Sequence, residues 1–125
     1  MTLKVASVGC IVALCGCSLM GQPGAESDGD MALAGRARDE LRACAVAYAS
    51  SHDTRRLTGF EVAQASVGAC SQYANQVERY TIAAAADRSR RAPGSIDPYV
   101  VGTQARELAE QGARDAVLQA IADRG

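Results

Sequence analysis

The chain has 125 residues, a formal net charge of -1, five cysteines and no tryptophan. Its length allows one small domain. An apolar fraction of 48% with only 4% aromatic residues predicts a thin core of small side chains. The near-neutral charge argues against general binding to nucleic acid, which requires a strongly basic surface.

The front of the chain has the layout of a signal segment. A positive start precedes an apolar run over residues 5–14, which is shorter than the roughly 20 residues that a membrane-spanning helix needs. The run ends in Leu14, Cys15, Gly16 and Cys17. These four residues resemble the lipobox of bacterial lipoproteins, although Cys15 stands where Ala or Ser is usual.

The resemblance implies that residues 1–16 are a signal peptide and that Cys17 carries acyl chains such as palmitate. It also implies a location in the bacterial cell envelope, facing the periplasm, with the lipid bilayer as a partner. Ser18 then favours the outer membrane in a Gram-negative organism. A signal peptide without lipidation and a short membrane anchor remain as alternatives. Residues 17–30 are rich in Gly and acidic side chains, which predicts a flexible tether.

For residues 31–125 the sequence predicts a single all-α domain, a three-helix antiparallel bundle. We expect helices at about residues 31–52, 58–89 and 98–123. Two start signals are clear: Thr58 and Glu61 form a capping box, and Asp97 followed by Pro98 is typical of a helix N-terminus. The first two helices carry apolar residues at every third or fourth position, from Ala34 to Tyr48 and from Phe60 to Ala84. The four tyrosines are expected to fill this core.

The third predicted helix carries two apolar faces. Its first half presents the residues Val101, Ala105, Leu108, Gly112 and Ala116 on one side. Val117, Leu118 and Ile121 fall roughly opposite. The helix is therefore expected either to bend near Gly112 or to expose a second patch. Such a patch would suit an envelope partner or self-association. Burial against an irregular part of the same fold is the alternative.

The cysteine count supports a disulfide. Cys10 and Cys15 leave with the signal peptide and Cys17 takes the lipid, so Cys44 and Cys70 remain as a pair in an oxidising compartment.

Residues that face each other across an antiparallel hairpin have a nearly constant sum of residue numbers. Cys44 with Cys70 and Ala37 with Val77 share one sum, so the pair is in register with the seam.

Candidate chemistry is sparse. Arg88, Arg90 and Arg91 form a candidate contact for an anionic partner, or cations that stabilise a helix C-terminus. Ser51, His52 and Asp53 include the residue types of a hydrolase triad, but neighbours in sequence cannot form the required chain of hydrogen bonds. We therefore expect no catalytic residue, no metal site and no cofactor.

Residues 34–84, with one cysteine on each helix of a hairpin, also resemble small uncharacterised helical envelope proteins. That resemblance implies no specific family and no activity. The expected function is a non-catalytic structural or protein-binding accessory on the membrane. The alternative is an inhibitor or protective lipoprotein that blocks an enzyme or toxin in the periplasm, with the three arginines as its contact.

Overall fold

A computed structural model describes residues 25–52, 55–92, 94 and 96–125. The predicted signal peptide, Cys17 and the start of the tether lie outside the described residues. The described part of the chain contains helices and no strand, which confirms the all-α prediction. The expected number of three helices is wrong, because the described residues form four: α1 (Ala25–Ser51), α2 (Gly59–Ala69), α3 (Ser71–Arg91) and α4 (Pro98–Ala122).

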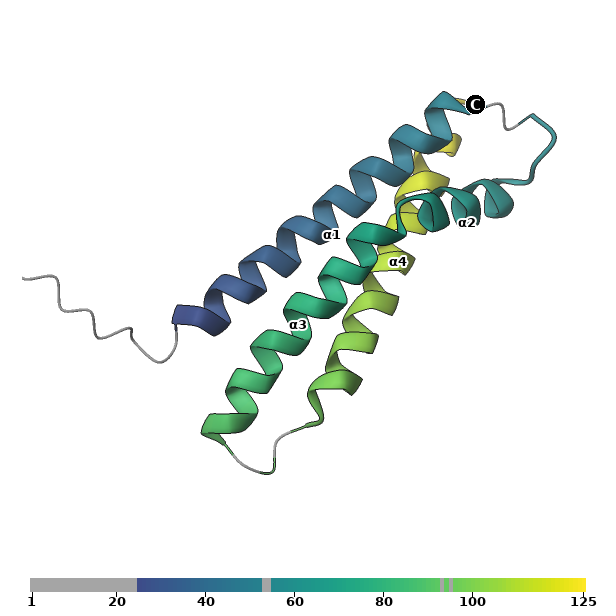
Figure 1. Ribbon diagram of the computed structural model, residues 1–125. Helices are drawn as coiled ribbons and strands as arrows, with labels where there is room; N and C mark the ends of the chain where they lie inside the picture. Colours follow the sequence, from purple (N-terminus) through teal and green to yellow (C-terminus); the bar gives the residue numbers. More distant parts are fainter. Residues whose placement is uncertain (1–24, 53–54, 93, 95) are drawn as a thin grey trace, which may run out of the picture.

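The helices form one bundle in which the second of the three predicted helices is divided in two (Figure 1). α1, α3 and α4 lie side by side along the lower part of the view, and α1 packs most extensively on α3. α2 lies across the upper part, where it contacts α1 and α4. Both α2 and α3 thus pack against α1 and α4. We call α3 and the parts of α1 and α4 that it contacts the α3 half of the bundle, and α2 and the parts that it contacts the α2 half.

α1 begins at Ala25, earlier than the start predicted near Met31, so the last residues of the predicted tether are helical. Asp28 and Asp30 lie in this early part of the helix. Acidic side chains near a helix N-terminus are favoured by the helix dipole. Residues 25–30 contain few apolar side chains, so the apolar periodicity of the sequence does not extend to the true start of α1.

The buried face of α1 is lined by small side chains. Ala34, Ala37 and Leu41 are buried as predicted, whereas the later buried positions are Ala45 and Ala49. Cys44 and Tyr48 are half-buried at the edge of this face. In the second half of α1 the buried positions are therefore one residue later than predicted. This shift is expected because a helix has 3.6 residues per turn.

The division between α2 and α3 lies at Cys70. Its backbone has φ -101° and ψ 15°, and its N–H donates to the carbonyl oxygens of Ser66 and Val67. Ser66 is fully buried, and its hydroxyl donates to the Val62 carbonyl oxygen at 2.7 Å. Such hydrogen bonds back to the preceding turn often bend helices.

Two local start signals are confirmed. The Thr58 side chain accepts from the Glu61 N–H, while a Glu61 carboxylate oxygen accepts from the Thr58 N–H at 2.8 Å. At the start of α4, Asp97 Oδ1 accepts from the Tyr99 N–H at 2.9 Å, and Pro98 is the first helical residue. Both starts depend on contacts between near neighbours in the chain.

The predicted faces of α4 are right at Ala105, which packs against the core, and wrong at Leu108 and Val117. Its buried residues are Gly102, Ala109, Ala113 and Val117, one continuous stripe along the whole helix. Leu108, which was expected in the core, is exposed. A Cβ at position 102 would lie 2.4 Å from Ile82 Cγ1, so the α3–α4 contact requires glycine there. Small residues are buried because the two backbones approach closely.

Two aromatic side chains also differ from the prediction. Phe60 was expected in the seam and Tyr99 in the core, yet both are exposed, Phe60 by 67% and Tyr99 by 70%. Phe60 lies in the first turn of α2 and Tyr99 in the first turn of α4. The core consequently consists mainly of Ala and Val, with Leu41 as its largest fully buried side chain.

Candidate functional site

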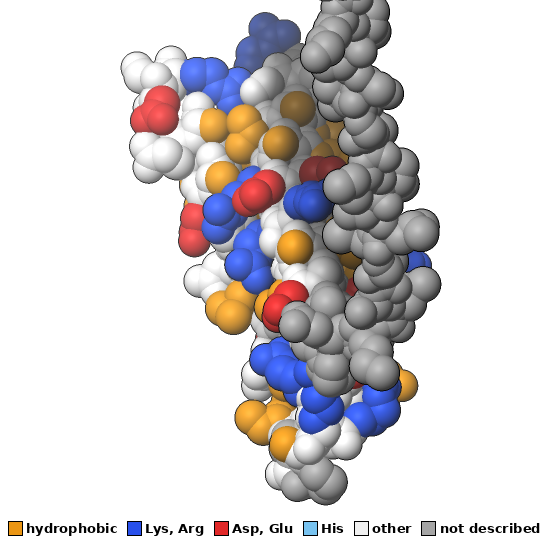
Figure 2. All heavy atoms as spheres, turned by 90° about the vertical axis from the view of Figure 1, so that its left-hand side faces the viewer, with side chains coloured by type: hydrophobic (Ala, Val, Ile, Leu, Met, Phe, Trp, Pro, Cys, Tyr) orange, Lys and Arg blue, Asp and Glu red, His pale blue; other side chains and the backbone are white. Residues whose placement is uncertain are grey.

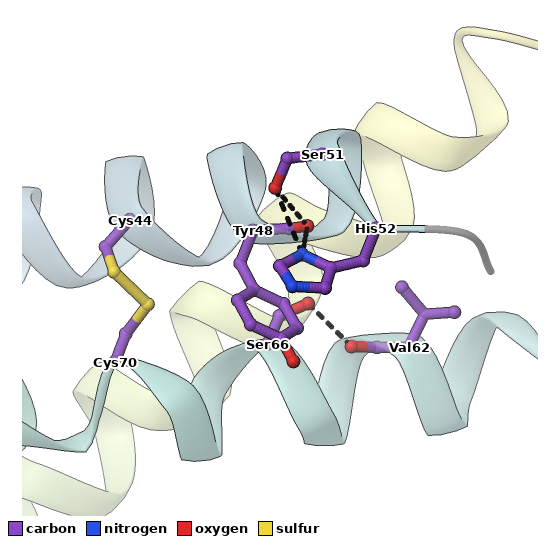
Figure 3. The surroundings of a disulfide bond; sticks show 7 residues. All are labelled: Cys44, Tyr48, Ser51, His52, Val62, Ser66 and Cys70. Atoms are coloured by element: carbon purple, nitrogen blue, oxygen red, sulfur yellow. Dashed lines mark hydrogen bonds between the residues drawn. A yellow bond between two sulfur atoms is a disulfide. The ribbon is translucent and has the colours of Figure 1, made fainter.

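The disulfide joins the middle of α1 to the junction between α2 and α3 (Figure 3). The Cα atoms of Cys44 and Cys70 lie 6.1 Å apart, and 26 positions separate the two residues in the chain. Cys70 is buried and Cys44 is half-buried. The predicted pairing is therefore present, at the point where the chain changes from α2 to α3.

The end of α1 brings Ser51 and His52 together without the geometry of a nucleophile and its base (Figure 3). His52 Nδ1 lies 2.9 Å from the Tyr48 carbonyl oxygen and 3.0 Å from Ser51 Oγ. Because a carbonyl oxygen can only accept, Nδ1 carries the proton in this arrangement and cannot take one from Ser51.

The His52 ring also stacks on Tyr48, with ring centroids 3.8 Å apart. Ser51 Oγ donates to the Tyr48 carbonyl oxygen as well, at 3.1 Å. These contacts satisfy a carbonyl group at the C-terminal end of α1. Asp53, the third residue of the discounted triad, lies outside the described residues.

The three predicted arginines lie at the end of α3 and have partners on their own helix. Arg90 and Arg91 both form ion pairs with Asp87, and Arg88 Nε donates to the Ala84 carbonyl oxygen. The structure thus groups these side chains, as the sequence suggested. It also places a carboxylate among them, which reduces the net positive charge of the cluster.

The predicted patch on α4 is changed by the fold. Val117 is fully buried and Ile121 is half-buried, so these two residues cannot form an open apolar surface. Leu118 remains 39% exposed, and its Cδ2 atom lies 3.4 Å from the point where a Cβ on Gly59 would stand. Leu118 therefore lies next to the first turn of α2.

A groove between α2 and α4 is the candidate functional site. Its volume is about 470 Å³, and it is lined by Phe60, Ala63, Gln64, Gln111, Arg114, Asp115 and Leu118. Arg114 donates to Gln64 across the groove at 3.5 Å. An exposed aromatic ring and a leucine within a polar rim match the composition of protein-binding surfaces.

The sequence did not identify this groove. Phe60 follows the capping residue and continues the three-residue spacing of the α2 stripe, so periodicity placed it in the core. Ala63 and Val67 are buried as predicted, and Val62 and Ser66 are buried where the periodicity had placed Phe60. The polar Ser66 does not stand out as a core residue in the hydropathy pattern. The exposure of Phe60 follows from where α2 crosses α4, which depends on tertiary packing.

Two ionisable groups have shifted pKa values because of hydrogen bonds near helix ends and between helices. The backbone N–H and then the hydroxyl of Thr58 lower the pKa of Glu61 below its usual range. Glu110, followed by Glu78 on α3, raises the pKa of Arg106. Both shifts stabilise the charged forms of groups that hold helices in place.

Within the described ranges, acidic, histidine and cysteine side chains do not gather in groups of three that could hold a metal ion. The same part of the chain contains no helix with the length and apolarity needed to cross a membrane. A comparison with protein-family models, curated proteins and solved structures finds no match for this chain.

Proposed function

We propose that the protein is a lipid-anchored component of the bacterial cell envelope that binds another envelope protein through the α2–α4 groove without catalysing a reaction. The anchor is the lipobox-like sequence that ends at Cys17. The observation that carries the binding role is the position of Phe60 and Leu118, two exposed apolar side chains from different helices on one groove.

The groove has the features of a binding surface. A flat aromatic side chain offers a large apolar area and loses little conformational freedom on binding. The surrounding amide and charged side chains of Gln64, Gln111, Arg114 and Asp115 can form hydrogen bonds at the rim. Phe60 is two-thirds exposed, so packing within one molecule leaves most of this side chain available to a partner.

The disulfide supports an envelope location. An intact bond between Cys44 and Cys70 persists in an oxidising compartment such as the periplasm. Mass spectrometry of the protein extracted from membranes should show lipid on Cys17 and the loss of two hydrogen atoms for the disulfide. A free Cys44 thiol or an unmodified Cys17 would contradict this part of the proposal.

Site-specific photocrosslinking in intact cells tests the binding role. A photoreactive residue at position 60 should give a discrete crosslinked band, and the same residue at position 72, an exposed site on α3, should not. The Leu118→Glu substitution should remove the position-60 band while the protein stays membrane-bound. Equal crosslinking from positions 60 and 72, or a band that persists in Leu118→Glu, would contradict the proposal.

The identity of the captured protein separates this role from the alternative of an inhibitor. An inhibitor should capture an incoming enzyme or toxin and lose protection when Arg88, Arg90 and Arg91 are reversed in charge. A structural accessory should capture a resident envelope protein and tolerate that change at the opposite end of the bundle.

A further inference from the structure

The end of the bundle opposite the α2–α4 groove exposes a second set of apolar side chains. It lies where the chain turns from α3 into α4, at the bottom of Figure 1. Ile96 is 71% exposed, Tyr99 70% and Val100 46%. Ile96 lines one hollow with Val101, and Tyr99 and Val100 line a second hollow with Thr103, so the turn before α4 and the first turn of α4 both expose apolar side chains.

Arginines border this apolar surface. Arg88, Arg90 and Arg91 occupy the last turn of α3, immediately before the turn into α4. Figure 2 shows arginine and hydrophobic side chains next to one another at this lower end of the molecule. Asp28, Asp30, Asp87 and Asp97 belong to the same end, so the charge there is close to balanced and the apolar side chains dominate its chemistry.

A hollow joins the two kinds of side chain. Its volume is about 370 Å³, and it is lined by Ala85, Arg88, Ser89, Ile96 and Val101. Apolar walls with a guanidinium among them complement an amphiphile, which has an apolar chain and an anionic head. Tyr99, with an apolar ring and a polar hydroxyl, is a residue type enriched at membrane–water interfaces.

The start of α1 lies at this same end. Gly29, Asp30 and Leu33 of α1 line a surface groove together with Ala86 and Asp87 of α3. The first turns of α1 are therefore beside the last turns of α3. Residues 18–24 connect Cys17 to Ala25, and the chain between these two residues can span at most about 28 Å. A lipid on Cys17 would keep this end of the bundle close to the bilayer.

We infer that Ile96, Tyr99 and Val100 dock into the headgroup region of the membrane, with Arg88, which lines the hollow beside Ile96, on lipid phosphates. The inference rests on the proposed anchor at Cys17 but adds an orientation that an anchor alone does not set. The long axis of the bundle points away from the bilayer, and the α2–α4 groove faces outward. Membrane contact at one end thus leaves the protein-binding groove accessible at the other.

A single tryptophan can report this orientation, because the natural chain has none. The full lipidated protein is placed in vesicles of zwitterionic and anionic phospholipids whose acyl chains are brominated near the headgroup. Tyr99→Trp is compared with Phe60→Trp, a matched control at an equally exposed aromatic position on the far end. We expect at least about twofold quenching of the tryptophan at position 99 and little change at position 60.

The Ile96→Asp substitution in the Tyr99→Trp background sharpens the test. It changes an exposed residue, so the helical circular dichroism spectrum should stay the same while the quenching is lost. Equal quenching at positions 60 and 99, or quenching at 99 that survives Ile96→Asp, would overturn the docking. If the fluorescence of the tryptophan at position 99 changes with protein concentration and not with lipid, a second copy of the chain covers this surface. That result would also overturn the membrane docking.

Failure of the anchor would look different. If Cys17 is not lipidated, the mass of the membrane-extracted protein lacks the acyl chains and the protein does not sediment with the vesicles. If the protein sediments with the vesicles and position 99 is not quenched, the anchor stands and the docking is wrong.

Discussion

The α3 half and the α2 half of the bundle are held by different contacts. α3 has 21 residues, and its buried positions Ala74, Val77, Thr81, Ala84 and Ala85 pack along α1 and α4. α2 has only 11 residues, of which four are buried. Its start is fixed by the capping box and its end by Cys70. A long helix can depend on its seam, whereas a short helix depends on how its two ends are fixed.

The largest effect is expected from removal of the disulfide, which should affect the α2 half most. Cys44→Ala combined with Cys70→Ala should lower the free energy of unfolding by about 3 kcal/mol, as expected for a crosslink that closes a loop of this length. Denaturation in urea, followed by circular dichroism, measures the loss. Hydrogen exchange should rise more in α2 than in α3.

Reduction of the natural protein is the matched control for this double variant. It should lower stability by a similar amount, because it removes the same constraint. If the double variant is as stable as the natural protein, the disulfide does not hold the α2 half in place.

The next effect concerns the α3 half. Gly102→Ala should lower the free energy of unfolding by about 1–3 kcal/mol, because the new Cβ overlaps Ile82 and overpacks the α3–α4 contact. Thermal unfolding measures the change. Gly35→Ala, in the interior of α1, is the control, since a Cβ there meets no atom within 4 Å. It should raise stability by about 0.5–1 kcal/mol, as glycine disfavours a helix interior. The same sign for both variants would contradict the close α3–α4 approach.

A smaller effect is expected at the start of α2. Thr58→Ala removes the side-chain acceptor for the Glu61 N–H and should cost about 1 kcal/mol. Hydrogen exchange should increase in the first turn of α2 and stay unchanged in α3. An equal increase in both helices would mean that the cap stabilises the whole bundle and not the α2 half.

The same cap predicts a pH dependence. The folded-state pKa of Glu61 is lowered by Thr58, so the stabilisation is complete above the pKa of the unfolded carboxyl. It is lost as the pH falls through the lower, folded-state pKa, because the protonated carboxyl is a poorer acceptor. Glu61→Gln should remove this contribution to the pH dependence of unfolding in acid. An unchanged acid profile in Glu61→Gln would contradict it.

The smallest effect is expected for the two ion pairs of Arg106, one within α4 and one to α3. Arg106 Nε donates to Glu110 at 2.9 Å, and Arg106 Nη1 lies 3.2 Å from Glu78 on α3. These side chains are partly exposed, so Arg106→Ala should cost less than about 1 kcal/mol. Arg106→Lys keeps the charge and tests whether the forked geometry matters. If Arg106→Ala lowers the free energy of unfolding as much as Gly102→Ala does, packing between α3 and α4 is not enough to hold the α3 half.

Much of the fold could be predicted from residues that are near one another in the chain. The capping box at Thr58 and the Asp97–Pro98 start require contacts over two or three residues, so their residue types already determine them. The register of Cys44 with Cys70 follows from the helical period and the antiparallel hairpin. The cluster of Arg88, Arg90 and Arg91 was also apparent, although its pairing with Asp87 was not predicted.

The tertiary structure alone decided the buried face of α4 and the exposure of Phe60 and Tyr99. Each depends on how closely two distant segments approach. Hydropathy favoured Leu108 as a core residue, but a tight contact between backbones selects Gly102 and Ala109 instead. For the same reason, the groove of Phe60 and Leu118 exists only where α2 crosses α4. The sequence by itself determined where α2 and α4 start, because capping depends on near neighbours in the chain, and which cysteines pair, because the helical period puts them in register. Packing distance decided which side chains remained available for binding.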